Sequence, residues 1–139
     1  MDFKFTTEEE DFKLELNNFL TKELPEGWND PQDDIFEIAK LEVEMRRKLG
    51  KKGWRTMAWP KEYGGQDASP MMQLIYKEEI AYQGAQKIGD QGTDFIGPTI
   101  IIHGTEEQKK EHLTRISSGD GFWCQGYSEP EAGSDLAGL

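Results

Sequence analysis

The chain has 139 residues, of which 27 are acidic and 16 are basic, so its formal net charge is −11. Such an acidic surface repels a phosphate backbone, and we therefore expect no nucleic-acid partner. The longest mostly apolar run, Phe95 to Ile102, is too short to span a bilayer, and the acidic N-terminus lacks the features of a signal peptide. With Cys124 as the only cysteine, these observations predict a soluble cytoplasmic protein without an intrachain disulfide or a cysteine-based zinc site.

The first predicted element is an amphipathic helix near the N-terminus. Thr7 and Glu10 have the spacing of a capping box. Apolar residues then recur at helical spacing until Pro25 stops the pattern. The sequence therefore predicts a helix over about residues 8–23.

A second amphipathic helix is predicted between the acidic pair Asp33 and Asp34, which suits a helix N-terminus, and the terminating Gly50. Five basic residues crowd its C-terminal end, where cations complement the helix macrodipole. We therefore interpret this cluster as structural rather than as a phosphate-binding patch. Its members are Arg46, Arg47, Lys48, Lys51 and Lys52.

A third helix is predicted after an extended connection rich in glycine and proline. Ser69 provides the N-cap, Pro70 takes the first helical position, and the helix ends near Gly84. Glu78 lies within the apolar stripe, so we expect a cationic or hydrogen-bonding partner for its carboxylate; the alternative is a catalytic role. The stripe expected to face the core comprises Met71, Leu74, Ile75 and Tyr82.

Two further helices are predicted before the C-terminal tail. Residues 95–103 are apolar and predict a short buried helix, kinked at Pro98. Thr105 and Gln108 form a second capping box, which opens a helix that closes at residues 117–119. His103 and His112 have no neighbours at ligand spacing, so no metal site is predicted.

The tail changes character after residue 120. Phe122, Trp123 and Tyr127 predict a strand, and residues 129–135 predict a tight turn. The complete pattern predicts an all-α bundle of about five or six helices over residues 1–120. A short strand and turn over residues 121–139 would then open a β-domain.

Hydroxyl groups and a glycine give this turn the means to hold an anion. Ser128, Ser134 and the backbone N–H groups around Gly133 could cradle a phosphate or the polar edge of a heterocycle. The segment matches neither the dinucleotide fingerprint, nor the nucleophile elbow, nor the P-loop. The residues alone favour simple loop formation over ligand binding.

The tail also resembles a known family. Residues 127–136, YSEPEAGSDL, are similar to the signature that acyl-CoA dehydrogenases carry at the first strand of their middle β-domain. Similar blocks occur upstream in the family's order, at residues 57–65, at 78–81, and at 100–113, where HGTEEQKK is found. The resemblance covers most of the chain from about residue 45 onward.

This resemblance implies a flavoprotein that removes two hydrogens across the α and β carbons of an acyl-CoA thioester. A base takes the α proton and FAD takes the β hydride. Ser128 would donate hydrogen bonds to the pyrimidine edge of the flavin, and Ser134 would lie near the FAD pyrophosphate and the pantetheine arm of CoA. The residues expected to border FAD are Gln125, Tyr127, Ser128, Gly133 and Ser134. Those expected to contact substrate are Thr93, Asp94 and Phe95, which would help to wall the acyl cavity, and Ser134.

Two departures from the family pattern shape the remaining expectations. Glu131 stands where many members have glycine or another small residue, and the chain stops at Leu139, where the family continues. The catalytic glutamate and most CoA contacts belong to that continuation, so we expect no catalytic residue, no activity and no measurable FAD binding in this chain alone. The full-length enzyme would use an electron-transfer partner and form a homo-oligomer. The alternatives are a non-catalytic all-α interaction module or subunit, and an acyl-CoA oxidase or flavin-dependent hydroxylase of the same fold.

Overall fold

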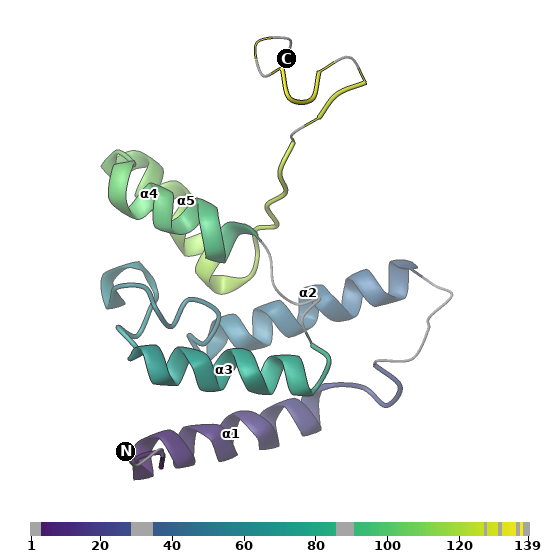
Figure 1. Cartoon of the computed structure of the whole chain (residues 1–139), viewed down its shortest axis with the longest axis vertical. Helices are drawn as coiled ribbons and strands as arrows, with labels where there is room; N and C mark the ends of the chain where they lie inside the picture. Colours follow the sequence, from purple (N-terminus) through teal and green to yellow (C-terminus); the bar gives the residue numbers. More distant parts are fainter. Residues whose placement is uncertain are drawn as a thin grey trace.

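The structure is a computed structural model that describes residues 4–28, 35–85, 91–126, 128–130, 132–135 and 137 (Figure 1). Within these residues the regular structure is helical and no strand is present, which confirms the predicted all-α class. The α-helices are α1 (Thr7–Glu23), α2 (Ile35–Lys51), α3 (Pro70–Tyr82), α4 (Gly97–His103) and α5 (Glu106–Ser118). The other helical elements are a 3-10 helix, η1 (Lys61–Tyr63), and a π-helical turn, η3 (Gly92–Ile96). None of the described helices is long and apolar enough to cross a membrane.

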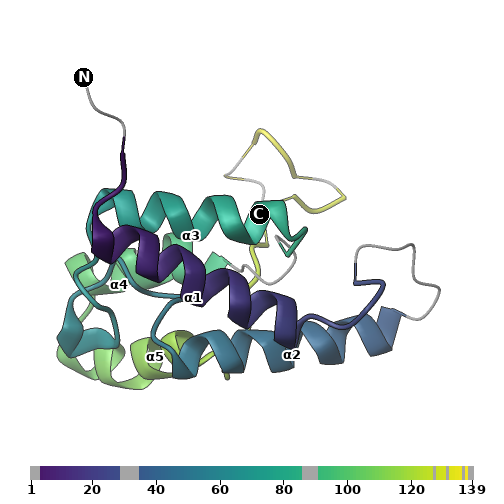
Figure 2. The same ribbon diagram turned by 90° about the horizontal axis from the view of Figure 1, so that it is seen from below.

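The helices pack around two apolar clusters. α1 lies against α3, and α5 contacts both α4 and α2 (Figure 1, Figure 2). The buried members of the larger cluster are Phe12, Leu16, Leu20, Trp28, Met45, Leu49, Trp54, Met57, Ile75 and Ala85. The buried members of the smaller cluster are Trp59, Leu113 and Ile116.

Among the described residues two capping boxes are present, one of them a residue earlier than predicted. Thr105 and Gln108 cap α5 as expected, with the Gln108 N–H donating to the Thr105 hydroxyl. α1 begins instead after Thr6, whose hydroxyl accepts from the N–H of Glu9, so the predicted pairing of Thr7 with Glu10 is wrong. The run TTEEE satisfies both registers, because each threonine has a glutamate three residues later.

α2 continues one residue past Gly50, where the sequence predicts its end. At Gly50 the helix crosses α5 closely: a Cβ built on this glycine would lie 2.4 Å from the carbonyl oxygen of Ser118. A larger residue would therefore push the two backbones apart. Asp33 and Asp34, predicted at the start of this helix, lie outside the described residues.

The core-facing side of α3 differs from the prediction. Ile75 is buried as expected, but Met71, Leu74 and Tyr82 are exposed, Tyr82 by 83%. A second stripe, with Met72, Tyr76 and Ile80 partly buried, packs against the larger cluster instead. Both stripes satisfy helical spacing, and only the position of α1 decides which of them is covered.

The buried carboxylate of α3 is Glu79 rather than Glu78, which is exposed. Glu79 accepts a hydrogen bond from Nδ2 of Asn17 at 3.1 Å, and its Oε1 lies 3.6 Å from Nζ of Lys13. Both partners are on α1. The expected pairing of a carboxylate on this helix therefore exists one residue further along the chain, and it ties α1 to α3.

The predicted helix over residues 95–103 forms, but it is only partly buried. Its exposed side carries Phe95 and Ile102, which are 65% and 71% exposed. The irregularity expected at Pro98 lies immediately before it, where the N–H of Gly97 donates to the carbonyl of Gly92 in the π-helical turn. Pro98 then stands in the first turn of α4, where a missing N–H is tolerated.

The predicted strand in the tail is wrong for the residues that are described. Residues 121–126 form no regular structure, because a strand needs a partner to satisfy its backbone groups and none lies beside it. The predicted turn is present: the N–H of Glu129 donates to the carbonyl of Ala132 at 2.8 Å, and the reverse bond is 3.2 Å long. Figure 1 shows this tail extending away from the helices.

Candidate functional site

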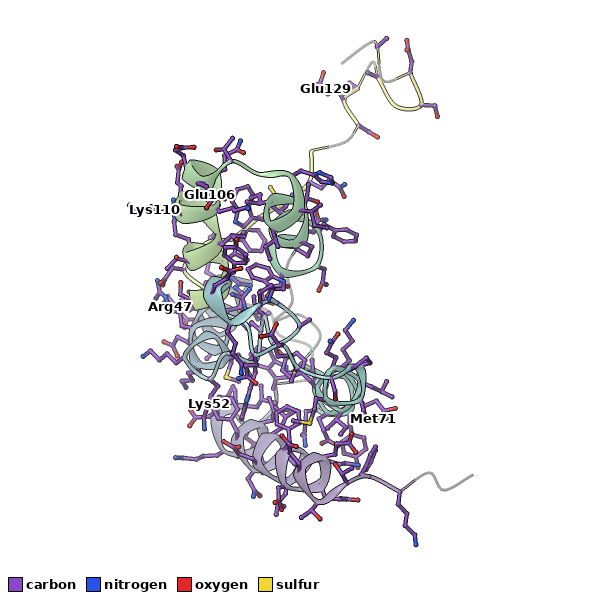
Figure 3. All side chains as sticks on the ribbon, turned by 90° about the vertical axis from the view of Figure 1, so that its left-hand side faces the viewer. Arg47, Lys52, Met71, Glu106, Lys110 and Glu129 are labelled. Atoms are coloured by element: carbon purple, nitrogen blue, oxygen red, sulfur yellow. The ribbon has the colours of Figure 1, made fainter. Side chains whose placement is uncertain are left out.

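The turn in the tail holds most of the residues predicted to border FAD. Gln125, Ser128, Gly133 and Ser134 are all exposed, and the pairing of residues 129 and 132 places Ser128 and Gly133 at the two ends of one turn. Tyr127, the remaining predicted residue, lies outside the described residues. Figure 3 labels Glu129 on this turn, well separated from the helices. The predicted roles of these residues stay predictions.

At two glycines in this segment, no steric contact among the described residues requires that the side chain be absent. A Cβ built on Gly126 or on Gly133 meets no atom within 4 Å. Exposed hydroxyls and unfilled space beside a glycine are what a closely bound polar ligand requires. This segment has both.

The basic cluster at the end of α2 is engaged in contacts with other parts of the chain. Arg47 meets Asp120 at 2.9 Å, Lys48 meets Glu23 of α1 at 2.8 Å, and Lys52, the residue after α2, meets Glu15 of α1 at 2.8 Å. These ion pairs link the end of α2 to α1 and to Asp120, two residues after α5. They support the structural interpretation of the cluster.

A largely apolar cavity of about 370 Å³ lies between α3, the residues that follow α2, and η3. Thr93 and Asp94, two of the residues predicted to wall the acyl cavity, line it. They also line a second cavity of about 350 Å³ beside Pro98 and Ile102. Phe95, the third predicted residue, lines neither cavity and is exposed.

The polar side of the larger cavity includes groups that the sequence analysis did not single out. Burial raises the pKa of the Tyr76 phenol, the positive charge of Arg55 opposes that shift, and the negative charge of Asp94 adds to it. Arg55 also donates to the carbonyl of Ile116 at 2.6 Å. Tyr76 and Arg55 come from different parts of the chain, so no local spacing could have indicated their proximity.

Neither histidine lies in a metal-binding arrangement. The ring of His112 meets the ring of Trp123 edge to face, with centroids 5.4 Å apart. In the described part of the chain, no group of three or more His, Cys, Asp or Glu side chains could hold a metal ion. Cys124 is exposed.

Comparison with known proteins gives a consistent result. The family model described as "Acyl-CoA dehydrogenase, N-terminal domain" matches residues 6–120. "Acyl-CoA dehydrogenase FadE26" of Mycobacterium tuberculosis is 38% identical, with 100% of this chain and 35% of that protein covered. "Acyl-CoA dehydrogenase IpdE1" of the same organism is 40% identical, with 94% and 35% covered. The chain thus spans about a third of the length of these relatives.

Solved structures share the fold. The ChsE4-ChsE5 complex from Mycobacterium tuberculosis matches with a TM-score of 0.81 at 36% identity, covering 100% of this chain and 35% of that one. A structure titled "Tcur3481-Tcur3483 steroid ACAD" matches with a TM-score of 0.71 at 30% identity, covering 100% and 36%. The helical arrangement described above is therefore also found in longer proteins.

Proposed function

Because the chain belongs to the acyl-CoA dehydrogenase family, through its N-terminal domain, we propose that it forms the helical part of an FAD-dependent enzyme that dehydrogenates an acyl-CoA thioester between its α and β carbons. The family match over residues 6–120 carries this proposal. The exposed turn of the tail, with its two hydroxyls and its unfilled glycine, supports it.

The residues of the tail fit a flavin. Ser128 and Ser134 are exposed donors, and the space beside Gly133 allows a planar ring or a phosphate to approach the backbone. We assign Ser128 to the pyrimidine edge, where a donor stabilises the negative charge that gathers on reduction, and Ser134 to the pyrophosphate and the pantetheine arm. When bound, FAD supplies the acceptor for the β hydrogen.

The segment around η3 is proposed to contribute to the acyl site. Thr93 and Asp94 line two neighbouring cavities with mostly apolar walls, which suits an acyl group more than a phosphate. One structural neighbour is titled a steroid ACAD, so the finer proposal is a bulky alicyclic acyl group. If the complete enzyme turned over octanoyl-CoA faster than a steroid acyl-CoA, that finer proposal would be contradicted.

We propose that the complete enzyme is a hetero-oligomer built from two different acyl-CoA dehydrogenase chains. ChsE4-ChsE5 and Tcur3481-Tcur3483 are each named as a pair of chains, which favours this arrangement over the homo-oligomer expected from the resemblance. Light scattering on the purified complete enzyme distinguishes the two, since a stable homo-oligomer with full activity would exclude the need for a second chain. The electron acceptor is proposed to be a separate electron-transfer protein.

A domain exchange tests the central proposal. Residues 1–139 replace the matching N-terminal part of FadE26, and the chimera is assayed for flavin absorbance and acyl-CoA-dependent dye reduction. We expect a yellow, active chimera whose FAD affinity falls in Ser128→Ala and is retained in Ser128→Thr, which keeps the hydroxyl. A folded chimera without flavin, beside a yellow parent enzyme, would refute the proposal.

A further inference from the structure

The chain leaves α5 through a glycine pressed against α2. Gly119 has φ of +82°, and a Cβ at this position would lie 2.7 Å from the carbonyl carbon of Arg46. A side chain here would be strained by the left-handed backbone and blocked by α2 at the same time. The chain therefore turns on the surface of α2 as it enters the tail.

The next residues are tied down by hydrogen bonds and an ion pair. Asp120 meets Nε of Arg47 at 2.9 Å and accepts from the hydroxyl of Ser118 at 2.9 Å. The N–H of Gly121 donates to the carbonyl of Arg115 at 3.0 Å. These contacts fix residues 119–121 against both α2 and α5.

Arg46 holds the following residue through its guanidinium group. Its carbon Cζ lies 5.0 Å from the ring centroid of Phe122, within the range of a cation–π contact. The side chain is 5% exposed, and in the described part of the chain its buried Nη1 has no hydrogen-bond partner, with Glu42 at 3.9 Å as a long ion pair. Because an unsatisfied buried cation is costly, the ring of Phe122 supplies attraction that Arg46 otherwise lacks.

The described contacts between the tail and the helices end at Trp123, two residues before Gln125, the first of the residues proposed to border FAD. Trp123 still packs against His112, whereas Cys124, Gln125 and Gly126 are exposed. The direction in which the chain leaves Trp123 thus limits where Ser128 and Ser134 can lie relative to the helices.

We propose that Arg46 and Arg47 are positioning residues that fix the exit direction of residues 119–123 and so bring Ser128 and Ser134 to one place relative to the helices. The role of residues 125–134 rests on the proposed function. The fixed direction is a property of this chain by itself. An exposed ion pair such as Arg47–Asp120 contributes little to unfolding free energy, so its effect lies in orientation.

The sole cysteine gives a direct measurement of this direction. Spin labels at Cys124 and at an introduced Glu10→Cys on α1 report the distance between tail and body by pulsed electron paramagnetic resonance. We expect a narrow distribution in the parent, and about a twofold broadening when Arg46→Met and Arg47→Ala are combined, because an unanchored segment samples loop motions. Lys40→Ala, which breaks the Lys40–Glu37 pair on the same helix away from the tail, is the matched control and should change nothing.

Further variants separate orientation from folding. Asp120→Asn removes the ion pair from the tail side. Arg47→Lys keeps the positive charge, so its distance distribution should be narrower than that of Arg47→Ala. Circular dichroism should show the same helical content in all variants, and urea unfolding should be unchanged in Asp120→Asn and Arg47→Lys, which alter only an exposed ion pair. A parent distribution as broad as that of the double variant, or no change in either Asp120→Asn or the double variant, would overturn the proposal.

The FadE26 chimera provides the functional readout. Arg46→Met with Arg47→Ala should weaken FAD binding there by about tenfold, as misplaced contacts do. Broadening without weaker FAD binding would overturn the positioning role. A chimera that binds no FAD in any form would instead contradict the proposed function and leave the distance result standing.

Discussion

The helical body, residues 7–118, and the tail, which begins after residue 120, differ in how their residues are packed. In the body, Leu16 is fully buried in the larger cluster, and the ring of Trp59 packs against Gly97. In the tail, a Cβ built on Gly126 or Gly133 meets no atom within 4 Å. Packing among the described residues therefore accounts for the body positions but not for these two tail glycines.

Leu16→Ala is the largest test of this contrast. Removing a fully buried side chain from the larger cluster should lower the free energy of unfolding by about 2–5 kcal/mol, through lost burial and the cavity left behind. Urea unfolding followed by circular dichroism measures it. Leu14→Ala, on the exposed side of the same helix, should change it by less than about 0.5 kcal/mol. Equal losses in the two variants would show that α1 does not pack as described.

Glycine replacement compares body and tail with the same chemical change. In Gly97→Ala the new Cβ would lie 2.0 Å from the ring of Trp59, so we expect a loss of about 1–3 kcal/mol by overpacking. Gly133→Ala meets no atom and should leave stability unchanged within about 0.5 kcal/mol. Thermal unfolding of both variants gives the comparison, and a destabilised Gly133→Ala would mean that the tail packs on the body after all.

Loss of a helix cap should have an intermediate effect. Thr105→Ala removes the hydroxyl that accepts from the Gln108 N–H, which should cost about 1 kcal/mol. Thr114→Ala, on the exposed side of α5, serves as the control and should be close to neutral. Amide exchange localises the change, since faster exchange should be confined to the first turn of α5.

The smallest expected effect is a titration at the junction of body and tail. The hydroxyl of Ser118, and after it the guanidinium of Arg47, lower the pKa of the Asp120 carboxyl. The contact with Arg47 is therefore present above the usual Asp range and is lost as pH falls through the lowered pKa. Carboxyl NMR should show the pKa of Asp120 rising toward its ordinary value in Ser118→Ala, and by less in Arg47→Ala. An unchanged titration in both variants would contradict the contacts described at Asp120.

Local signals in the sequence predicted the helices well. The helix predicted over residues 8–23 spans Thr7–Glu23, and Thr105 with Gln108 opens α5 as expected, because capping and apolar spacing act within a few residues. The buried side of α3 could not be predicted from the sequence. The stripe that begins at Met71 and the stripe that begins at Met72 both fit helical spacing, and only the position of α1 decides which of them is buried. The strand at Phe122 failed for the same reason, because its partner is not in the neighbouring sequence.

The residues of the candidate site also differ in whether a local sequence pattern indicates them. Ser128 and Ser134 were identified from a contiguous motif, which a sequence displays directly. Tyr76 and Arg55 come to line one cavity only after folding, and the proposed anchoring of the tail uses the contact between Arg47 and Asp120, which are 73 residues apart in the chain. Contacts of this range depend on the packing of whole helices, and no periodicity encodes them.

The crossing of α2 and α5 has a mechanical consequence. At Gly50 and Gly119 the two backbones touch without side chains between them. Side chains at an ordinary helix interface can absorb a small displacement by changing rotamer, but at this crossing there are none to do so. A displacement of residues 119–121 is therefore expected to shift the main chain of α2 as well.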